Sequence, residues 1–466
     1  MPKSAVDIVT EAGTLMQAGQ PAEAVKLLAP LHAANPGHDK MRQLMSSARL
    51  AAAREAYGRG DLEAGAGYLS DALEDDPNNP RLLGHRAIVA LRAGEPAMAE
   101  AFFSQAMTRA RHAGGDDGWI WTQAGSLARQ AGQIDRARRL VDARCTAAPD
   151  DPEAVYARAF IELACGNMAA GWSAYEARWQ MPGFSSPPKR THRPSWDGQS
   201  FDGRLLIWRE QGVGDEIMFA RHLPDVASRC RQVIVECDPR LRSLLSRSFP
   251  GHQFRSSAAD FTPNKVPDED FDRHIPLASL PGILAPDAAY PDAGAYLSAD
   301  PARQRHYRDQ LQSTSPNRRL IGVSWWSKNA EHGRTRSPGV SQWEPVFKVP
   351  GCRFISLQYG VSGDEAAARG IHTLPGLDAW QDLEGLAALT SAMDGVVTID
   401  NSTVHLAGAL AVPTVLLLPA YQDWRWQMPV SGPESLYQSV HVIRQQTPGE
   451  WNPAMKAAAA ALAGMD

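Results

Sequence analysis

The first 180 residues repeat a pattern of small residues and helix breakers between helix-like stretches with apolar faces. Each repeat has a glycine, a small residue five positions later and often a proline seventeen positions later. The glycines are separated by 41, 34, 38 and 34 residues and lie at Gly19, Gly60, Gly94, Gly132 and Gly166. A glycine closes the turn between two helices, small residues let the helices approach, and a proline ends the second helix. The pattern predicts stacked antiparallel helix pairs.

A period near 34 residues with small residues at these offsets resembles the tetratricopeptide repeat, or TPR. An ordinary helical bundle with glycines in coincidental positions is the alternative interpretation. A TPR solenoid offers a concave surface to an extended peptide or a partner helix, and it supplies no chemistry by itself. The resemblance therefore implies a macromolecular partner without identifying it.

The pattern changes after residue 180. Residues 181–203 are rich in Pro, Ser and Gly, which indicates an ordered linker or boundary. Beyond them, short apolar runs alternate with helical stretches, which favours parallel sheets with helices on both faces. The candidate strands are Leu205–Trp208, Val233–Glu236, Phe271–Ile275, Leu320–Ser324, Phe354–Leu357, Val396–Ile399 and Thr414–Leu418.

These patterns divide the chain into a helical-repeat domain (1–182), a linker (183–202), a first lobe (203–312) and a second lobe (313–466). The expected fold class is an N-terminal α-solenoid followed by an α/β part with two Rossmann-like lobes. The chain ends in a short predicted helix with Asn452 as its cap.

Composition narrows the classes of function. The 466 residues carry 47 Lys and Arg against 52 Asp and Glu, a net charge of -5, which argues against a dedicated nucleic-acid binder. No stretch reaches the roughly 18 apolar residues that span a bilayer, and Asp7 and Glu11 interrupt the apolar run of a signal peptide. None of the five cysteines forms a C-x-x-C pair, so neither a disulfide framework nor a zinc site is suggested. We expect a soluble, cytoplasmic protein that binds no nucleic acid.

Polar residues follow the predicted strands at the end where parallel sheets bind ligands. After Leu205–Trp208 come Gln211, Gly214 and Asp215. Two glycines in this segment permit a tight turn and close approach of a ligand. Asp215 is then expected at the mouth of a cleft, although a simple helix cap is the alternative.

A concentrated positive loop follows the strand predicted at 320–324. Its cationic residues are Lys328, His332, Arg334 and Arg336. Guanidinium forks suit phosphate oxygens, whereas a solvated surface loop is the alternative. Gln358 and Tyr359 occupy the corresponding place after the next strand.

The strand at 396–399 leads into a helix of small residues. Its first residues are Asp400, Asn401, Ser402, Thr403 and His405. A helix amino terminus carries free N–H groups and about half a positive charge, which suits a diphosphate. Capping by Asp400 or Ser402 is the alternative. After the last strand, Trp424 and Trp426 are candidates to line a sugar or base.

Residues 171–445 resemble the bacterial TPR-linked glycosyltransferases, which are related to the heptosyltransferases of glycosyltransferase family nine and more distantly to O-GlcNAc transferases. The matching segments are GWSAYEARW (171–179), PSWDGQSFDGRLLIWREQGVGDEIMFARHLP (194–224), IPLASLP (275–281), IGVSWWSKN (321–329) with RTRS (334–337), FISLQYG (354–360), and DNSTVHLAGALAVPTVLLLP (400–419) followed by DWRW (423–426). The resemblance implies an inverting transferase of GT-B type, with two Rossmann-like lobes facing across a cleft and no metal requirement.

The resemblance also assigns roles. It places the catalytic base at Asp215, and it implies that the nucleotide-sugar donor is bound by Gly214, Lys328, Arg334, Arg336, Gln358, Tyr359, Asp400, Asn401, Ser402, Thr403 and His405. Gln211, Ser279 and Trp424 are expected on the acceptor side of the cleft. GT-B folds often end in a helix that crosses back to the first sheet, which we expect of the helix beginning near residue 452.

We expect no cofactor, because the nucleotide sugar is a co-substrate and fixed N–H groups and cationic side chains replace a metal ion at the diphosphate. The string Asp268-Glu269-Asp270 spells the D-x-D metal motif of another transferase class, but it lies in a loop before a strand. The expected acceptor is a hydroxyl on a protein docked on the TPR surface, with flagellin a candidate by analogy. A lipid or polysaccharide acceptor is one alternative, and a non-catalytic scaffold is another.

Overall fold

The computed structural model describes residues 3–113, 118–181, 184–186, 188–256, 270–287, 294–328, 333–360, 363–420, 423–426, 436–447 and 449–465. They form two compact units, one of Met1–Pro149 with Lys328–Thr335 and one of Asp150–Ser327 with Arg336–Asp466. The helix pair after Pro149 groups with the α/β part, whereas the sequence pattern assigned residues up to 182 to the repeats. No helix among these residues is long and apolar enough to cross a membrane.

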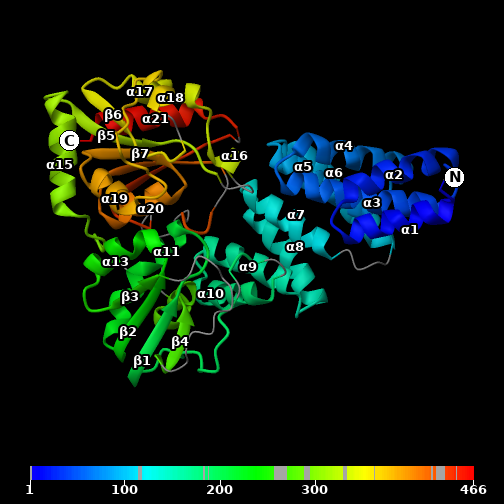
Figure 1. The fold of residues 1–466 in the computed structure, drawn as a ribbon, viewed down its shortest axis with the longest axis horizontal. Helices are drawn as coiled ribbons and strands as arrows, with labels where there is room; N and C mark the ends of the chain where they lie inside the picture. Colours follow the sequence, from blue (N-terminus) through cyan, green and yellow to red (C-terminus); the bar gives the residue numbers. More distant parts are fainter. Residues whose placement is uncertain are drawn as a thin grey trace. The chain divides into compact units, whose positions relative to one another are not determined.

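Eight helices make up the described part of residues 3–149, and each packs against the next one along the chain (Figure 1). They are α1 (Ala5–Gln17), α2 (Pro21–Ala34), α3 (Asp39–Gly58), α4 (Leu62–Asp75), α5 (Pro80–Arg92), α6 (Pro96–Ala113), α7 (Trp119–Gln130) and α8 (Ile134–Ala147).

The small residues of the repeat pattern lie at the turns and helix contacts that their spacing predicts. The five turn glycines have φ between 71° and 87°, the left-handed region that glycine adopts without strain. Five positions later, Ala24, Ala99 and Ala137 have no exposed surface. At Gly65 a Cβ would lie 3.2 Å from the Cβ of Tyr57, so a larger residue would push α3 and α4 apart. The helical-repeat prediction is confirmed.

The second unit begins with α9 (Pro152–Ala164), α10 (Met168–Tyr175) and the 3₁₀ turn η1 (Glu176–Gln180). These elements are attached to the first lobe by large buried side chains. The ring of Trp172 lies 6.1 Å from that of Phe219, and Arg178 forms an ion pair with Glu210. These two contacts explain why α9 and α10 belong to the α/β unit.

The first lobe is a parallel sheet of four strands in the order β3-β2-β1-β4. The strands are β1 (Phe201–Trp208), β2 (Cys230–Cys237), β3 (Gln253–Ser256) and β4 (Arg273–Pro276). Its helical segments are α11 (Val213–Phe219), η2 (Ala220–His222), α12 (Leu223–Ala227), η3 (Pro239–Leu241), α13 (Arg242–Ser248), η4 (Leu277–Ser279) and α14 (Leu280–Leu284). The predicted linker is attached to this sheet, because the N–H of Trp196 donates to the carbonyl of His274 at 2.8 Å.

The second lobe is a parallel sheet of five strands in the order β6-β5-β7-β8-β9. The strands are β5 (Arg319–Ser324), β6 (Cys352–Ser356), β7 (Gly395–Ile399), β8 (Thr414–Leu418) and β9 (Val440–Arg444). The helical segments are α15 (Pro301–Ser313), α16 (Gly333–Arg336), η5 (Val340–Trp343), α17 (Glu344–Phe347), α18 (Gly363–Ala367), α19 (Leu383–Ser391), α20 (Ser402–Ala409) and α21 (Asn452–Ala463). The prediction of two parallel-sheet lobes is confirmed, but α15, within the residues assigned to the first lobe, packs on α19 of the second.

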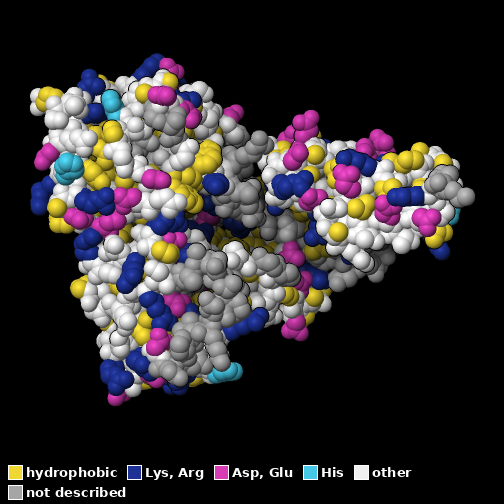
Figure 2. All heavy atoms as spheres, in the orientation of Figure 1, with side chains coloured by type: hydrophobic (Ala, Val, Ile, Leu, Met, Phe, Trp, Pro, Cys, Tyr) yellow, Lys and Arg dark blue, Asp and Glu magenta, His cyan; other side chains and the backbone are white. Residues whose placement is uncertain are grey.

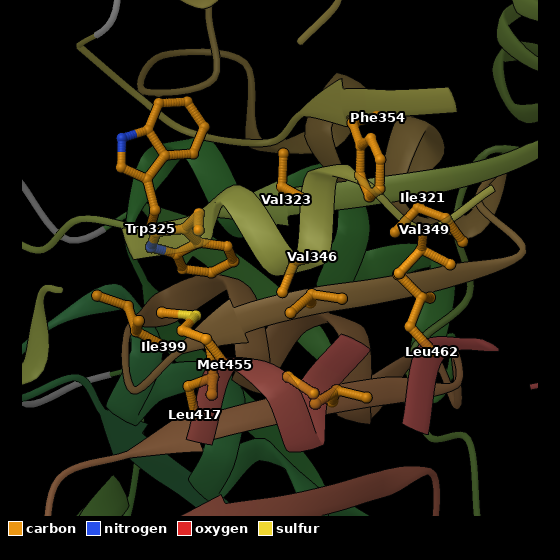
Figure 3. Packing of buried hydrophobic residues seen from close by; sticks show 14 of the residues in the cluster. Ile321, Val323, Trp325, Val346, Val349, Phe354, Ile399, Leu417, Met455 and Leu462 are labelled. Atoms are coloured by element: carbon orange, nitrogen blue, oxygen red, sulfur yellow. The ribbon is translucent and has the colours of Figure 1, made fainter. Parts of the chain in front are cut away.

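The last helix differs from its expected position. Instead of crossing back to the first sheet, α21 packs on β7, β8 and β9 of the second sheet. Its buried positions Met455 and Leu462 join Ile321, Ile399 and Leu417 in one apolar core, as Figure 3 shows. Burial of this face against its own lobe is the physical reason for the difference.

Charged side chains of both signs are interspersed over the face in Figure 2. Lys and Arg lie among Asp and Glu there, in keeping with the small net charge of -5. The described surface in that view therefore has no broad basic face of the kind that binds nucleic acid.

Candidate active site

The carboxyl ends of the two sheets bring Asp215 and Arg425 together. Asp215 lies in the first turn of α11, after β1, and Arg425 follows β8. The Nη2 atom of Arg425 lies 2.6 Å from Oδ1 of Asp215. Next to this pair, α11 packs on α20, where a Cβ at Gly214 would lie 3.3 Å from the ring of His405 and 3.5 Å from the Cα of Ser402. The expected base and the expected diphosphate segment are therefore neighbours.

The turn before α11 is held in an unusual backbone conformation. Gln211 has φ 62°, in the left-handed region that residues other than glycine rarely adopt. Its N–H donates to Oγ of Ser186 at 2.7 Å, and its side-chain amide donates to Oη of Tyr175 at 2.6 Å. The N–H of Gly212 then donates to Oδ2 of Asp215 at 3.3 Å, so Asp215 also caps α11. Gln211 therefore fixes the turn that presents Asp215.

Five side chains of alternating charge run from the first lobe into the second. Beyond Asp215, Nη1 of Arg425 lies 3.5 Å from Oδ1 of Asp423. Oδ2 of Asp423 lies 3.2 Å from Nη2 of Arg336, whose Nη1 lies 3.0 Å from Oδ2 of Asp400. All five side chains are at most 20% exposed, so solvent screens these ion pairs weakly. We call this set the charge chain.

The protonation states at the site follow from burial and charge. Burial acts to lower the pKa of Arg425, but the charges of Asp215 and Asp423 outweigh it and hold the pKa well above its ordinary value. Burial lowers the pKa of His405 to about 4, so its ring is neutral at pH 7, and Nδ1 lies 3.0 Å from Oη of Tyr437. At neutral pH the site therefore contains a fixed cation and a neutral imidazole.

The start of α20 is capped by Asn401, not by Asp400 or Ser402. Oδ1 of Asn401 accepts a hydrogen bond from the N–H of Thr403 at 2.9 Å, and Nδ2 donates to Oγ of Ser324 at 2.8 Å. Asp400 is 3% exposed and accepts a hydrogen bond from Nε1 of Trp426 at 3.0 Å. Because Asp400 is an anion facing Arg336, it orients that cation.

Gln358 organises the loops that follow β5 and β6. Its side-chain oxygen accepts hydrogen bonds from Oγ of Ser324 at 3.1 Å and from the N–H groups of Trp325 and Trp326 at 3.0 and 2.9 Å. Gln358 is 5% exposed, so its expected part in donor binding is to shape the backbone around the site.

An exposed aromatic group lies after the same two strands. The ring of Tyr359 lies 5.4 Å from that of Trp326 and 5.1 Å from that of Trp380. The two tryptophans are 40% and 44% exposed. Arg240 of the first lobe lies 4.9 Å above the ring of Trp380 and donates to its carbonyl at 2.9 Å. Only Tyr359 of this group was predicted from the sequence, because no strand pattern marks the loop that carries Trp380.

No family model matches the chain. Protein FlbA of Caulobacter vibrioides is 35% identical to it over 365 residues, which make up 71% of this chain and 59% of that protein. The chain therefore spans less than two thirds of the length of this relative.

Two solved structures show the kinds of protein that the chain is similar to. The E. coli ADP-heptose LPS heptosyltransferase II matches over 56% of this chain and 98% of its own, at 15% identity and a TM-score of 0.42. A mutant O-GlcNAc transferase of Thermobaculum terrenum matches over 91% of this chain and 92% of its own, at 13% identity and a TM-score of 0.33. Both are kinds of protein that the sequence resemblance named.

Two residues expected to line the cleft are core residues, which corrects the sequence analysis. Trp424 and Trp426 are 1% and 0% exposed. The ring of Trp424 lies 5.5 Å from that of Trp172 and 6.4 Å from that of Phe219. The ring of Trp424 joins the lobes, whereas that of Trp426 packs on His405 within the second lobe, so neither offers a face to a sugar.

Ser279 is also buried. Its Oγ accepts a hydrogen bond from Nη2 of Arg178 at 2.7 Å and donates to Oε1 of Glu176 at 2.6 Å. Arg178 in turn donates to both carboxylate oxygens of Glu210 at 2.8 and 2.9 Å. Ser279 thus completes a buried network instead of lining an acceptor cleft. The network joins three of the matching sequence segments, and the roles of Arg178 and Glu210 were not predicted from the sequence.

The cationic loop is only partly described. Lys328 is exposed and belongs to the first compact unit, whereas Arg336 belongs to the second. His332 and the side chain of Arg334 lie outside the described residues. Of this loop, Arg336 is therefore the residue that the structure places in the charge chain.

Proposed function

We propose that the chain is an inverting glycosyltransferase of GT-B type that needs no metal and moves a sugar from a nucleotide-sugar donor to a hydroxyl. One observation carries the proposal: a carboxylate of the first lobe, Asp215, lies beside Arg425 and the start of α20 in the second lobe. A base for the acceptor and cationic groups for the departing diphosphate are the two requirements of this reaction.

The proposed reaction is a single displacement. The acceptor hydroxyl attacks the anomeric carbon, and its proton passes to Asp215. The new bond joins the acceptor oxygen to that carbon, and the bond from the carbon to the diphosphate oxygen breaks. The leaving diphosphate takes the electron pair, and Arg336, Arg425 and the dipole of α20 stabilise its charge.

The donor side has support from particular contacts. Ser402 is half-buried beside Gly214, at the helix start that suits a diphosphate. The neutral ring of His405 packs against the same place, and Thr403 is buried behind it. Tyr359 offers an aromatic face among Trp326 and Trp380. The donor is a co-substrate in this proposal, so no resident cofactor takes part.

The acceptor in this proposal is a protein bound by the helical repeats, and flagellin is the candidate by resemblance. The repeats confirmed in residues 3–149 support a protein partner, because stacked helix pairs commonly present a surface for peptides. A cytoplasmic location belongs to the same proposal. Transfer to a lipid or polysaccharide is an alternative outcome of an acceptor assay.

Donor hydrolysis tests the enzyme proposal directly. We expect Asp215→Asn to lower turnover of the productive nucleotide sugar by about 10²–10⁴-fold, because the base is lost. Asp225→Asn, which neutralises an exposed carboxylate of the same lobe, is the matched control and should retain turnover. The assay includes EDTA, and an activity that EDTA abolishes would contradict metal independence. Equal turnover by wild type and Asp215→Asn would remove Asp215 as the base and support a scaffold role.

A further inference from the structure

Both carboxylate oxygens of Asp215 accept a hydrogen bond in the structure. Oδ1 accepts from Arg425 at 2.6 Å, and Oδ2 accepts from the N–H of Gly212 at 3.3 Å. The guanidinium occupies a lone pair of Oδ1 and competes with the proton of an acceptor hydroxyl for that oxygen. The arrangement is therefore a resting state for a base, and departure of Arg425 would free Oδ1.

The cations of the charge chain are also engaged. Arg336 lies between two carboxylates of its own lobe, Asp400 and Asp423, at 3.0 and 3.2 Å. Arg425 shares Asp423 with Arg336, but its shorter contact is with Asp215 of the other lobe. The charge chain contains three carboxylates and two guanidinium groups, so a diphosphate must compete with carboxylates for both of its cations.

Arg425 is the cation best placed to change partner. Its guanidinium lies 4.4 Å above the ring of Trp424, a buried face that supports the cation without using any of its N–H donors. Asp423 also fixes the backbone of Arg425, because the N–H of Arg425 donates to Oδ1 of Asp423 at 3.0 Å. The backbone is thus anchored while the guanidinium bridges two lobes.

We propose that Arg425 exchanges Asp215 for the donor diphosphate, so that the base is released only when the donor is bound. This inference rests on the proposed function. Binding of the diphosphate near Ser402 draws the guanidinium from Asp215, and the freed carboxylate then accepts the proton of the acceptor hydroxyl. Arg425 remains on the diphosphate as the leaving group departs. The exchange makes donor binding a condition for base catalysis.

Reciprocity gives this exchange a measurable signature. If diphosphate and Asp215 compete for Arg425, the bound diphosphate weakens the ion pair by some factor. Removing the charge of Asp215 must then tighten diphosphate binding by that same factor. A simple loss of repulsion would also tighten binding, but that effect would not need Arg425. The two explanations are therefore separated by a double-mutant cycle.

The experiment measures binding of inorganic pyrophosphate, ADP, UDP and GDP to the full chain by calorimetry without metal. We expect Asp215→Asn to bind about fivefold or more tightly than wild type. In the Arg425→Gln background the same substitution should change affinity less than twofold. Asp225→Asn, the matched loss of one negative charge, should leave affinity unchanged. Thermal denaturation checks that each variant is folded.

A second measurement needs no variant at Arg425. In a crystal structure of the wild type with pyrophosphate, the guanidinium of Arg425 should contact phosphate oxygens and lie beyond hydrogen-bond distance of Asp215. An intact Asp215–Arg425 pair beside bound pyrophosphate would overturn the exchange. So would an equal gain from Asp215→Asn in both backgrounds, or no gain in either. Absence of binding by all four anions to every folded variant would instead overturn the proposed function itself.

Discussion

At the scale of single residues, buried ion pairs determine where the candidate site is built. Arg178 and Glu210 are 0% and 1% exposed and share two parallel hydrogen bonds. Glu210 also accepts from the N–H of Ala278 at 3.1 Å. This pair ties η1 to the residues just before the turn that presents Asp215. Such a pair has to stay complete, because a single buried charge is costly.

We expect Glu210→Gln to destabilise the α/β unit by about 3 kcal/mol, because the buried Arg178 charge then keeps only the half-exposed Glu176 as an ionic partner. Urea unfolding followed by tryptophan fluorescence measures the change. The control is Glu344→Gln, which removes an exposed partner of Lys348 on α17 and should change stability little. A loss for Glu210→Gln no larger than that of the control would contradict the role given to the buried pair.

His222 predicts a dependence of stability on pH. It is 2% exposed, and burial, with a smaller contribution from Arg221, lowers its pKa to about 3. In the unfolded chain a histidine binds a proton near pH 6.5. Between these values the unfolded state holds more protons than the native state, so this group makes the protein less stable as the pH falls.

His222→Leu should remove this dependence, because leucine does not bind a proton. The substitution breaks no hydrogen bond, since neither ring nitrogen has a partner among the described residues. Relative to wild type, we expect its free energy of unfolding to rise by about 2 kcal/mol between pH 7 and pH 5. Denaturant titrations at both pH values test this. The exposed His306→Leu is the control and should show no such trend. Parallel pH profiles for wild type and His222→Leu would show that His222 is not the cause.

At the scale of elements, apolar runs were sufficient to predict most of the fold. All seven predicted strands are present, and the turn glycines lie where the repeat spacing places them. The two strands that were missed, β3 and β9, have the sequences QFRS and VHVIR. Their polar residues and the short length of β3 weaken the apolar signal. Such edge strands form because the neighbouring strand offers hydrogen bonds, which a pattern along one segment does not contain.

The candidate site was predictable in part for the same reason. The order of strand, turn and helix was enough to bring Asp215 near α20, because the carboxyl ends of parallel strands lie at one edge. The partner of Asp215 was not predicted, since Arg425 reaches it across two lobes. The exposed faces of Trp326 and Trp380 depend on loop packing, as does the burial of Trp424. Contacts of this kind have no local sequence signal.

Helix packing near the site gives a prediction at the element scale. In α20, a Cβ at Gly408 would lie 2.3 Å from the ring of Tyr437, which is 1% exposed and contacts His405. We expect Gly408→Ala to destabilise the α/β unit by about 1–3 kcal/mol through overpacking. Gly13→Ala is the matched control, because it lies within α1 with nothing within 4 Å of its Cβ and should gain helix propensity. Thermal denaturation compares the two, and an equal response would contradict close packing at Gly408.

At the scale of the whole molecule, the chain combines a helical-repeat unit with an α/β unit that has its own cores. The boundary lies at Pro149, ahead of α9 and α10. In the second unit, Trp172 and Arg178 provide contacts that the first lobe would otherwise lack. The repeat pattern continues through α9 and α10, so a reading of the period alone assigns these helices to the repeats. Their function, by contrast, is to complete the lobe that carries Asp215.

Two truncations test this division and the acceptor proposal together. A chain that begins at Asp150 retains the buried pair of Arg178 and Glu210, so we expect it to fold and to bind pyrophosphate like the full chain. A chain that begins at residue 183, the boundary predicted from the sequence, lacks Arg178 and leaves Glu210 buried without its partner. Because that loss costs about 3–5 kcal/mol out of a total stability of 5–15 kcal/mol, we expect it to unfold or aggregate.

The truncation that begins at Asp150 also separates donor hydrolysis from binding of the protein acceptor. We expect the chain that begins at Asp150 to hydrolyse the donor at the rate of the full chain, because the described contacts of the charge chain lie within the α/β unit. Its transfer to a protein acceptor should fall at least tenfold, since the helical repeats that bind the acceptor are absent. Transfer to protein at the full rate by this folded truncation would argue against docking on the repeats. Loss of donor hydrolysis as well would mean that the deleted residues 1–149 are needed for the reaction itself.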